Sequence, residues 1–328
     1  MIVVTGGAGF IGSVLVARLE EAGFDEIAVI DWLGHADKWR NLRNRRLAAL
    51  VEPENAFSFL DRNASSISAI FHMGAISETT ATDGDLVLRT NFALPLALWD
   101  WCARNGVRFI YASSAATYGD GTQGFDDLQD HESLRRLRPL NAYGWSKQVF
   151  DLRITQMTEA GAHRPPQWAG LKFFNVYGPN EYHKGGQQSV VSQLHKQIGA
   201  GQPATLFRSH NPKYPDGGQM RDFVWVDDVC DVMLWLYANP QASGLFNLGS
   251  GKARSFADLT HAVFRAMNRE PDIRFVDTPV AIRAKYQYFT EARMERLRSA
   301  GYGAPMTELE AGVEAYVRRY LDADDPYR

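Results

Sequence analysis

Residues 1–12 of the 328-residue chain read MIVVTGGAGFIG. The apolar run at residues 2–5 has the length of a strand, and apolar residues then recur at helical spacing up to Gly23. Gly6, Gly9 and Gly12 therefore lie in a turn between a first strand and a first helix. Such a turn lets the backbone approach a pyrophosphate, which the helix N-terminus also stabilises. The segment predicts a dinucleotide-binding unit, and a purely structural turn is the weaker alternative.

An acidic residue follows the second strand-like run. Residues 27–30 are apolar and end at Asp31, 19 residues after the last glycine of the turn. An acid near this offset hydrogen-bonds the adenosine ribose and favours NAD. Lys38, Arg40 and Arg43 follow, and a basic side chain there can pair with a 2′-phosphate. We therefore expect NADP with NAD as the alternative, while an ordinary solvated helix face is the alternative for the basic cluster.

Strand-like and helix-like segments alternate along the first half of the chain. Further apolar runs of strand length follow at 69–71, 108–112 and 169–174. This order predicts an α/β fold with a Rossmann-like, doubly wound parallel sheet, whose ligand lies at the carboxyl ends of the strands. We place the NAD(P)-binding domain at 1–174 and a smaller, partly discontinuous α/β substrate domain mainly at 175–328. Returning strand-like runs indicate that the segment around 222–248 crosses back to the first domain.

Hydroxyl groups and a Tyr/Lys pair form the candidate catalytic set. The run RFIYASS ends in Ser113 and Ser114, at the sheet edge where a nicotinamide would lie. Tyr143 and Lys147 are four residues apart, which puts both on one face of a helix. A lysine ammonium beside a phenol favours the phenolate, so Tyr143 could exchange a proton with a substrate hydroxyl. A surface aromatic next to a solvated lysine is the alternative for this pair alone.

Landmarks along nearly the whole chain resemble the extended short-chain dehydrogenase/reductases. They are TGGAGFIGS, FHMGA, YASSAATYG, the Tyr143/Lys147 pair, FFNVYGP, RDFVWVDDV and LFNLGSG. The resemblance implies an epimerase, a dehydratase or a related enzyme that transiently oxidises a nucleotide-sugar. FFNVYGPNEYHKG and RAKYQYFT look most like the branch acting on ADP-activated heptoses. That branch implies C6″ epimerisation of ADP-heptose through a 6-keto intermediate, with tightly bound, recycled NADP, in lipopolysaccharide core synthesis.

The resemblance also assigns roles to individual residues. The catalytic set it implies is Ser114, Tyr143, Lys147 and, from the HKG motif, the second acid/base Lys184. The cofactor-binding set is Gly6, Gly9, Phe10, Ile11, Gly12, Asp31, Trp32, Lys38, Met73, Gly74, Ala75, Ile76, Ser77, Asn91, Lys147 and Val176. The substrate-binding set is Ser114, Asn175, Gly186, Gln193, Phe207, Arg208, Ser209, His210, Arg221 and Tyr286. A phosphate-binding or solvated lysine is the alternative for Lys184, and a salt bridge to Asp222 is the alternative for Arg221.

The chain departs from the branch at several of these positions. Trp32 and Pro53 stand where the best-known relatives have Asn and Lys, and the change at Pro53 removes one 2′-phosphate contact. Gly186 and Gln193 stand where those relatives have Ser and His, so the sugar is less firmly indicated than the reaction class. Insertions also occur around 126–138 and 210–220. A UDP-sugar 4-epimerase, another nucleotide-sugar enzyme and a non-catalytic NADP-sensing module remain the alternative functions.

Composition and charge exclude several other classes of protein. The net charge of −3 gives no basic field for phosphate backbones, so we expect no nucleic-acid partner. The sequence has no signal peptide and no apolar run of membrane-spanning length, so we expect a cytoplasmic protein without membrane contact. Two separated cysteines predict no metal site. The resemblance implies a homo-oligomer such as a pentamer, and the tail DADDPYR is expected to be frayed.

Overall fold

A seven-stranded parallel sheet forms the centre of the molecule. The computed structural model describes residues 1–34, 36–283 and 286–328. In spatial order the strands are β10 (Gly244–Leu248), β6 (Trp168–Phe173), β5 (Arg108–Ser114), β4 (Ala69–His72), β1 (Ile2–Thr5), β2 (Ile27–Ile30) and β3 (Ala49–Val51). All neighbouring pairs are parallel. The order reverses between β1 and β4, which is where ligands bind in such sheets. The predicted α/β doubly wound fold is confirmed.

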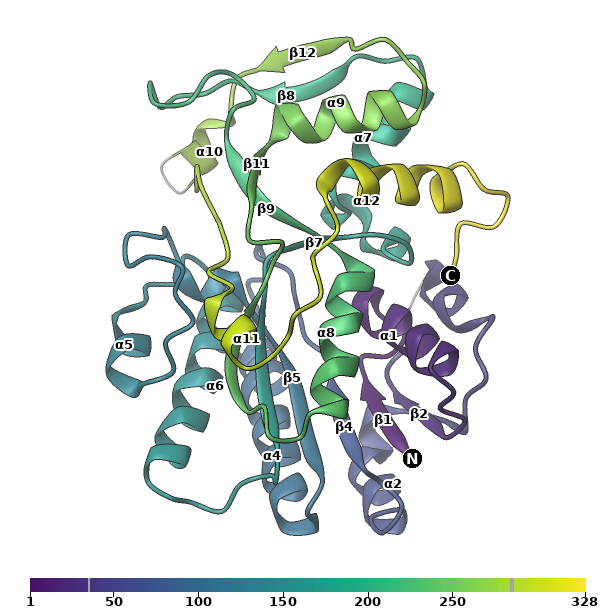
Figure 1. Cartoon of the computed structure of the whole chain (residues 1–328), viewed down its shortest axis with the longest axis vertical. Helices are drawn as coiled ribbons and strands as arrows, with labels where there is room; N and C mark the ends of the chain where they lie inside the picture. The colour runs from purple at the N-terminus through teal and green to yellow at the C-terminus, as the bar shows by residue number, and fades with distance from the viewer. Residues whose placement is uncertain (35, 284–285) are drawn as a thin grey trace.

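Helices cover both faces of this sheet (Figure 1). One face carries α4 (Leu94–Asn105) and α6 (Ala142–Glu159), and the other carries α1 (Phe10–Glu21) and α8 (Val226–Ala238). Shorter helical segments in this half are η1 (Ala36–Leu42), η2 (Pro53–Asn55), α2 (Ala56–Arg62), α3 (Gly84–Leu88), η3 (Arg89–Ala93), η4 (Ala115–Tyr118) and α5 (His131–Arg136). Because helices bury both faces, the central strands are continuous apolar runs.

Two small sheets build the other half of the molecule, at the top of Figure 1. The first has the order β11 (Ala253–Ser255), β9 (Met220–Trp225), β7 (Asn175–Tyr177), and the second pairs β12 (Ile273–Val276) with β8 (Ala204–Phe207). The helical segments are η5 (Tyr182–Gln187), α7 (Val190–Gly199), α9 (Phe256–Ala266), α10 (Val280–Arg283), α11 (Glu295–Ser299), α12 (Leu309–Tyr316) and η6 (Val317–Leu321). β7 follows β6 directly, so this half begins at the carboxyl edge of the main sheet.

The returning segment crosses back only in part. α8 packs against α1, and β10 joins the main sheet beside β6. The strand expected at 222–225 does form, but it pairs with β7 and β11 in the small sheet instead of the large one. The sequence could not reveal this difference, because both environments bury the same apolar run.

The insertion at 126–138 covers the exposed edge of the main sheet. The carboxylate of Asp127 accepts a hydrogen bond from the backbone N–H of Asn247 at 2.8 Å, and Gln129 accepts one from Leu245 at 3.3 Å. Both acceptors therefore bind backbone donors of the edge strand β10. Covering an edge in this way prevents it from pairing with another chain.

The prediction of a frayed C-terminal tail is wrong. Arg328 forms an ion pair with Asp227 and hydrogen bonds at 3.0 Å to the carboxylate of Glu21, on α1. The hydroxyl of Tyr182 donates to the carbonyl of Pro326 at 2.8 Å. These long-range contacts fix the tail against η5 and α1, and no local sequence pattern reports such contacts.

Two expectations concern what the fold lacks. Across the described ranges, no helix is long and apolar enough to span a bilayer. In the same residues, no group of three or more His, Cys, Asp or Glu side chains is placed to hold a metal ion.

Candidate active site

One cavity of about 870 Å³ lies at the carboxyl ends of the main strands, between the two halves of the molecule. Most of the residues predicted for catalysis and cofactor binding line it. They are Gly6, Gly9, Phe10, Ile11, Gly12, Asp31, Lys38, Met73, Gly74, Ala75, Ile76, Ser77, Ser114, Tyr143, Lys147, Val176 and Lys184. A volume of this size is typical of a pocket for a small molecule or cofactor.

The glycine turn forms the floor of the cavity at the start of α1. Gly6 has φ +67°, a conformation that favours glycine, and a Cβ atom there would lie 2.4 Å from the backbone of Gly74. A Cβ on Gly12 would lie 2.2 Å from the carbonyl oxygen of Gly6. No side chain caps the described first turn of α1, so its N-terminus offers N–H groups to a phosphate. The turn therefore fits a dinucleotide pyrophosphate.

The end of β2 provides the polar group expected for the ribose. The carboxylate of Asp31 accepts hydrogen bonds from the Ala8 backbone at 2.9 Å and from Lys38 Nζ at 2.8 Å. Lys38 thereby neutralises Asp31 at the cavity wall. Arg40 instead pairs with Asp37 at 3.2 Å, and Arg43 pairs with the side-chain carboxylate of Asp325 in the C-terminal tail. Only the first residue of the predicted basic cluster thus lies among the cavity-lining residues that the structure describes.

Two residues of the predicted cofactor set lie beside the cavity. Trp32 is half-exposed, and its indole N–H donates to both carboxylate oxygens of Glu54 at 3.0 Å. Asn91 is fully buried in η3, where its side chain bonds both the N–H and the C=O of Ile76 at 2.9 Å and donates to Ser146 at 3.0 Å. In this structure, Asn91 holds the cavity-lining loop 73–77 in place from behind.

Ser114, Tyr143 and Lys147 come together on one wall. Ser114 ends β5, and α6 presents Tyr143 and Lys147 one turn apart. Asn141 starts this helix by accepting the Gly144 N–H at 2.8 Å, which fixes the position of its first turn. Gly144 permits a close approach, because a Cβ there would lie 2.6 Å from the carbonyl of Ala116.

Burial affects the acid–base groups on this wall. It lowers the pKa of Lys147 to about 8, against a smaller opposing effect of the Asp151 carboxylate. It raises the pKa of Tyr143, while a hydrogen bond with Ser114 acts in the opposite direction. Burial therefore weakens the hold of the ammonium on its proton and strengthens that of the phenol, and the hydrogen bond with Ser114 partly offsets the effect on the phenol.

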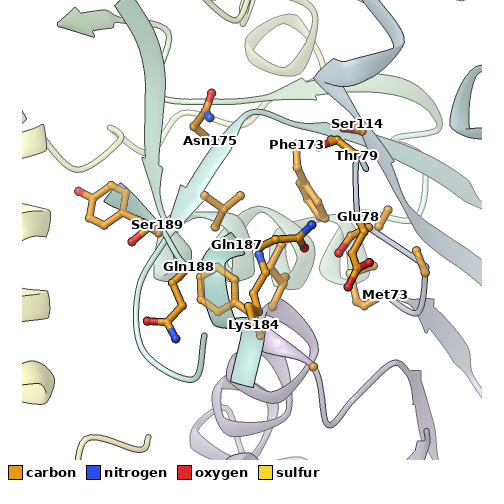
Figure 2. Close-up of a pocket in the computed structure, with 18 of the residues that line it drawn as sticks. Met73, Glu78, Thr79, Ser114, Phe173, Asn175, Lys184, Gln187, Gln188 and Ser189 are labelled. Atoms are coloured by element: carbon orange, nitrogen blue, oxygen red, sulfur yellow. The ribbon is translucent and has the colours of Figure 1, made fainter. Parts of the chain in front are cut away.

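Lys184 lies on η5, away from Ser114 in the close-up (Figure 2). Its Nζ lies 5.5 Å from the centre of the Phe10 ring, and burial lowers its pKa. The loop is held by Glu181, whose carboxylate accepts from the hydroxyls of Ser189 at 2.6 Å and Tyr316 at 2.9 Å. A second cationic acid thus lines the cavity from a different element than Tyr143.

Asn41 connects this loop to the glycine turn. Its side-chain amide donates to the carbonyl of Ala8 at 2.9 Å and to that of Asn180 at 3.0 Å, and it lies 3.2 Å from His183 Nδ1. Burial, together with the nearby charges of Lys38 and Lys184, lowers the pKa of His183 to about 4. This histidine is therefore neutral near neutral pH.

The predicted substrate residues fall into two groups. Asn175 and Gly186 line the cavity, and the side chain of Gln193 bonds the carbonyl of Gln188 at 2.7 Å behind the same loop. Outside the cavity, the guanidinium of Arg221 lies 5.5 Å from the ring centre of Tyr286, which packs edge-on against Phe207 at 6.2 Å.

The remaining predicted substrate positions lie near this aromatic cluster. Arg208 pairs with Asp277 at 4.0 Å, the Ser209 N–H donates to Asp216 at 2.8 Å, and the His210 N–H donates to Tyr288 at 2.8 Å. These three residues follow β8 and remain predictions as substrate ligands.

The salt bridge considered for Arg221 is replaced by other contacts. The Asp222 carboxylate accepts hydrogen bonds from Ser250, Gly251 and Ala292. Arg221 points a donor at the carbonyl of Met220 at 2.8 Å, and burial lowers the pKa of its guanidinium. A buried guanidinium beside aromatic rings is well suited to bind a phosphate oxygen.

Sequence reasoning missed several residues that line the cavity. They are Glu78, Thr79, His183, Gln187, Gln188 and Ser189. Gln187 lies between Lys184 and Phe173 in Figure 2. The proximity of these residues to the predicted FHMGA and HKG motifs was the available signal, since both loops continue along the cavity wall.

Comparisons with known proteins agree with this geometry. The model of the NAD dependent epimerase/dehydratase family matches residues 2–249. A protein of Nitratidesulfovibrio vulgaris named ADP-L-glycero-D-manno-heptose-6-epimerase is 50% identical, and one of the same name from Fusobacterium nucleatum is 44% identical; each match covers 100% of both chains. The crystal structure of the Helicobacter pylori enzyme of that name has a TM-score of 0.79 at 27% identity, covering 97% of this chain and 95% of that one.

The match extends through the glycine turn, the Tyr143/Lys147 helix and the HKG loop, all of which lie within residues 2–249. The resemblance stated from sequence motifs is thereby confirmed. The chain belongs to the NAD-dependent epimerase/dehydratase family.

Proposed function

We propose that this protein inverts C6″ of ADP-D-glycero-D-manno-heptose to give ADP-L-glycero-D-manno-heptose, through a transient 6-keto intermediate. The observation that carries the proposal is a single cavity that contains a dinucleotide-binding turn, the Ser114/Tyr143/Lys147 wall and a second acid, Lys184. The names of the full-length relatives support the choice of sugar.

The residues of the first wall perform the oxidation. Ser114 hydrogen-bonds the reacting oxygen, and Tyr143 accepts the proton of the C6″ hydroxyl. The Lys147 ammonium stabilises the phenolate form of Tyr143, which becomes the neutral phenol when it takes up this proton. When bound, the nicotinamide cofactor supplies the group that accepts a hydride and returns it. The substrate must present its other face before the hydride returns, so a proton donor is needed on a second wall.

Lys184 is the group in the described part of the cavity that can fill this second role. Burial lowers its pKa, which makes the ammonium a better proton donor than a solvated lysine. With one proton donor on each wall, the ketone can rotate to present its other face while the dinucleotide stays in place. Because the cofactor ends in the state in which it began, the protein should need no added NAD(P).

The direct test is incubation of the purified protein with ADP-D-glycero-D-manno-heptose without added cofactor. We expect a mixture of the two C6″ epimers, resolved by proton NMR, and no net change in nicotinamide absorbance. A parallel panel of UDP-, GDP- and dTDP-sugars provides the control. Turnover of a non-ADP sugar alone would contradict the substrate, and a 4-epimerase would then be the better description. Nucleotide-dependent binding of a partner without any turnover would instead favour a sensor.

For the nucleotide, we propose NADP with Lys38 as the residue that pairs with the 2′-phosphate. Lys38 lines the cavity and neutralises Asp31, which would otherwise repel a phosphate. We expect Lys38→Ala to weaken NADP binding about 10- to 100-fold, as for loss of a charged hydrogen bond, and to change NAD binding little. Calorimetric titration of both nucleotides measures this. Arg40→Ala is the matched control because Arg40 pairs with Asp37. An unchanged NADP preference in Lys38→Ala would count against Lys38 as the phosphate ligand, whereas tighter binding of NAD than of NADP by the unsubstituted protein would favour NAD.

The pathway, location and assembly follow from the same proposal. An ADP-heptose epimerase would supply lipopolysaccharide core synthesis from the cytoplasm, and we propose a homo-oligomer such as a pentamer. Measurement of the mass in solution by light scattering tests the assembly.

A further inference from the structure

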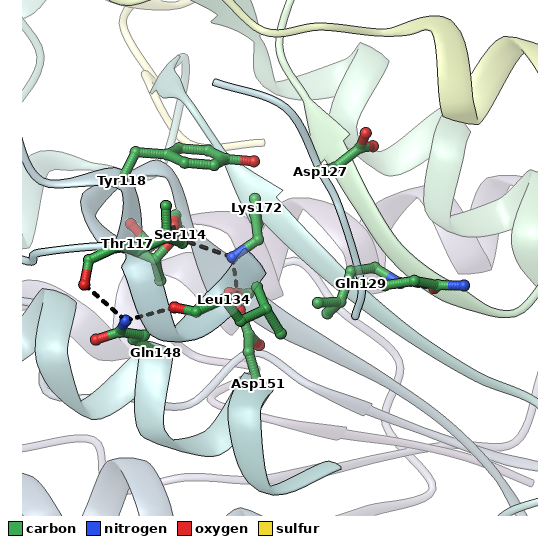
Figure 3. Close-up of polar contacts among 12 residues, drawn as sticks. Ser114, Thr117, Tyr118, Asp127, Gln129, Leu134, Gln148, Asp151 and Lys172 are labelled. Carbon is green, nitrogen blue, oxygen red and sulfur yellow. Dashed lines mark hydrogen bonds and ion pairs between the residues drawn. The ribbon is translucent and has the colours of Figure 1, made fainter. Parts of the chain in front are cut away.

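A fully buried ion pair lies directly behind the cavity wall formed by Ser114, Tyr143 and Lys147, which we call the catalytic wall. Lys172 of β6 and Asp151 of α6 are both inaccessible to solvent, and their charged atoms are 2.7 Å apart. Tyr111 donates to one oxygen of this carboxylate at 2.9 Å, and Ser113 donates to the other at 2.6 Å. Every oxygen of Asp151 therefore has a donor, as a buried carboxylate requires. Figure 3 shows Lys172 between Asp151 and the Tyr118 ring.

The pair is connected to each member of the catalytic set. Lys172 also donates to the hydroxyl of Thr117 at 2.9 Å, which in turn donates to the carbonyl of Ser114 at 2.8 Å. On α6, Asp151 lies one turn after Lys147 and two turns after Tyr143, on the same face. The pair thus lies between the strand that carries Ser114 and the helix that carries the phenol and ammonium.

Stability alone does not explain a buried pair of this kind. Removing two charges from water costs more than their attraction often returns, and an apolar pair of similar volume can stabilise a fold as well or better. Any charge that remains in this position acts on its neighbours with little screening. The buried charges behind Tyr143 are therefore candidates for a role in the acid–base chemistry of this residue.

Few other charged or titratable groups face Tyr143 and Lys147. His72 approaches Lys147 from β4; it is neutral, since burial and the Lys147 charge lower its pKa to about 3. Asp151 is the carboxylate whose charge raises the pKa of both Tyr143 and Lys147. Asp127 lies beyond Lys172, near Tyr118, and its carboxylate accepts the Asn247 N–H. The net charge behind Tyr143 and Lys147 thus depends on Asp151 and Lys172, and substitution of either residue should change it.

We propose that Asp151 and Lys172 are positioning residues that set how readily the Tyr143 phenol loses its proton. Lys172 neutralises Asp151, so the Lys147 cation acts fully on the phenol. Without Lys172, the carboxylate would retain its two hydroxyl donors and would take Lys147 as its nearest cation. Its negative charge would then oppose the phenolate. Without Asp151, the Lys172 cation would add to that of Lys147 and favour the phenolate. The two single changes should therefore shift Tyr143 in opposite directions.

The test is a pH titration of the Tyr143 phenol in the cofactor-bound protein. Phenolate absorbance is measured in each background, and the absorbance of the same background carrying Tyr143→Phe is subtracted from it. We expect Lys172→Met to raise the pKa of Tyr143 by about one unit, a tenfold loss of phenolate at a given pH below it, and Asp151→Asn to lower the pKa by a similar amount. The double variant and Lys172→Arg should both lie close to the wild type. The acid limb of the kcat profile should move in the same directions.

Opposite shifts of the Tyr143 pKa in the two single variants distinguish an electrostatic effect on the phenol from a role in stabilising the fold. If both single variants shift the phenol in the same direction, or leave it unchanged while only their melting temperatures fall, the proposal is overturned. If Lys172→Met does not fold, the double variant against Asp151→Asn isolates the Lys172 charge, and the double variant must then have the higher pKa. The inference rests on the proposed role of Tyr143. The titration needs no substrate, so failure of the epimerase assignment and failure of this inference remain distinguishable.

Discussion

Tyr143→Phe is expected to reduce turnover of the nucleotide-sugar by about 10²- to 10⁴-fold, the usual contribution of a general acid–base group. This corresponds to about 3 to 5 kcal/mol of transition-state stabilisation. The phenylalanine ring fills the same space, so the cavity should keep its shape and its cofactor. The loss should fall on kcat with little change in KM, because the hydroxyl acts on the proton being transferred. The measurement is the initial rate of epimer formation by NMR.

Two observations make this prediction specific. Tyr237→Phe is the matched control, because Tyr237 bonds Ser68 at 3.0 Å on the far side of the sheet and should keep full activity. Release of bound nucleotide after denaturation checks that Tyr143→Phe still carries cofactor. A variant that retains cofactor and wild-type turnover would remove Tyr143 from the mechanism and, with it, the proposed use of the first wall.

Six of the seven strands of the main sheet could be predicted because they are buried on both faces and therefore appear as apolar runs. The short strands could not. β3, β7 and β11 have three residues each and are largely half-exposed, so their formation depends on distant partners and not on local pattern. The pairing of β9 with β7 and β11 is of the same kind. Long-range pairing of this type has no periodic signature in the sequence.

The grouping of Ser114, Tyr143 and Lys147 was predictable for a different reason. The spacing of Tyr143 and Lys147 on one helix, and the position of Ser114 at a strand end, are local features that the fold then brings together. Asp151 and Lys172, by contrast, could not be predicted to lie at the site. Each lies within an otherwise ordinary element, and only the parallel pairing of β5 with β6 brings Lys172 to the helix behind the site.

Lys184→Met is expected to reduce epimerisation by a similar factor, about 10² to 10⁴, through loss of the second proton donor. Methionine retains the length and apolar stem of lysine, so the packing against Phe10 should survive. The proposed mechanism assigns Lys184 to the second face of the ketone. The first oxidation should therefore still occur. Rapid mixing with substrate should show reduced nicotinamide that is reoxidised only slowly, with little formation of the inverted epimer.

The alternative for Lys184, a cation that binds a substrate phosphate, predicts a different result. Loss of a phosphate ligand should raise KM and leave kcat largely unchanged, because such a contact is made equally in the ground and transition states. Lys252→Met is the matched control, since Lys252 is largely exposed and pairs with Glu308 away from the cavity. Loss confined to kcat in Lys184→Met would support two proton donors. A KM effect alone would leave inversion to Tyr143 and require the ketone to rotate against a single acid.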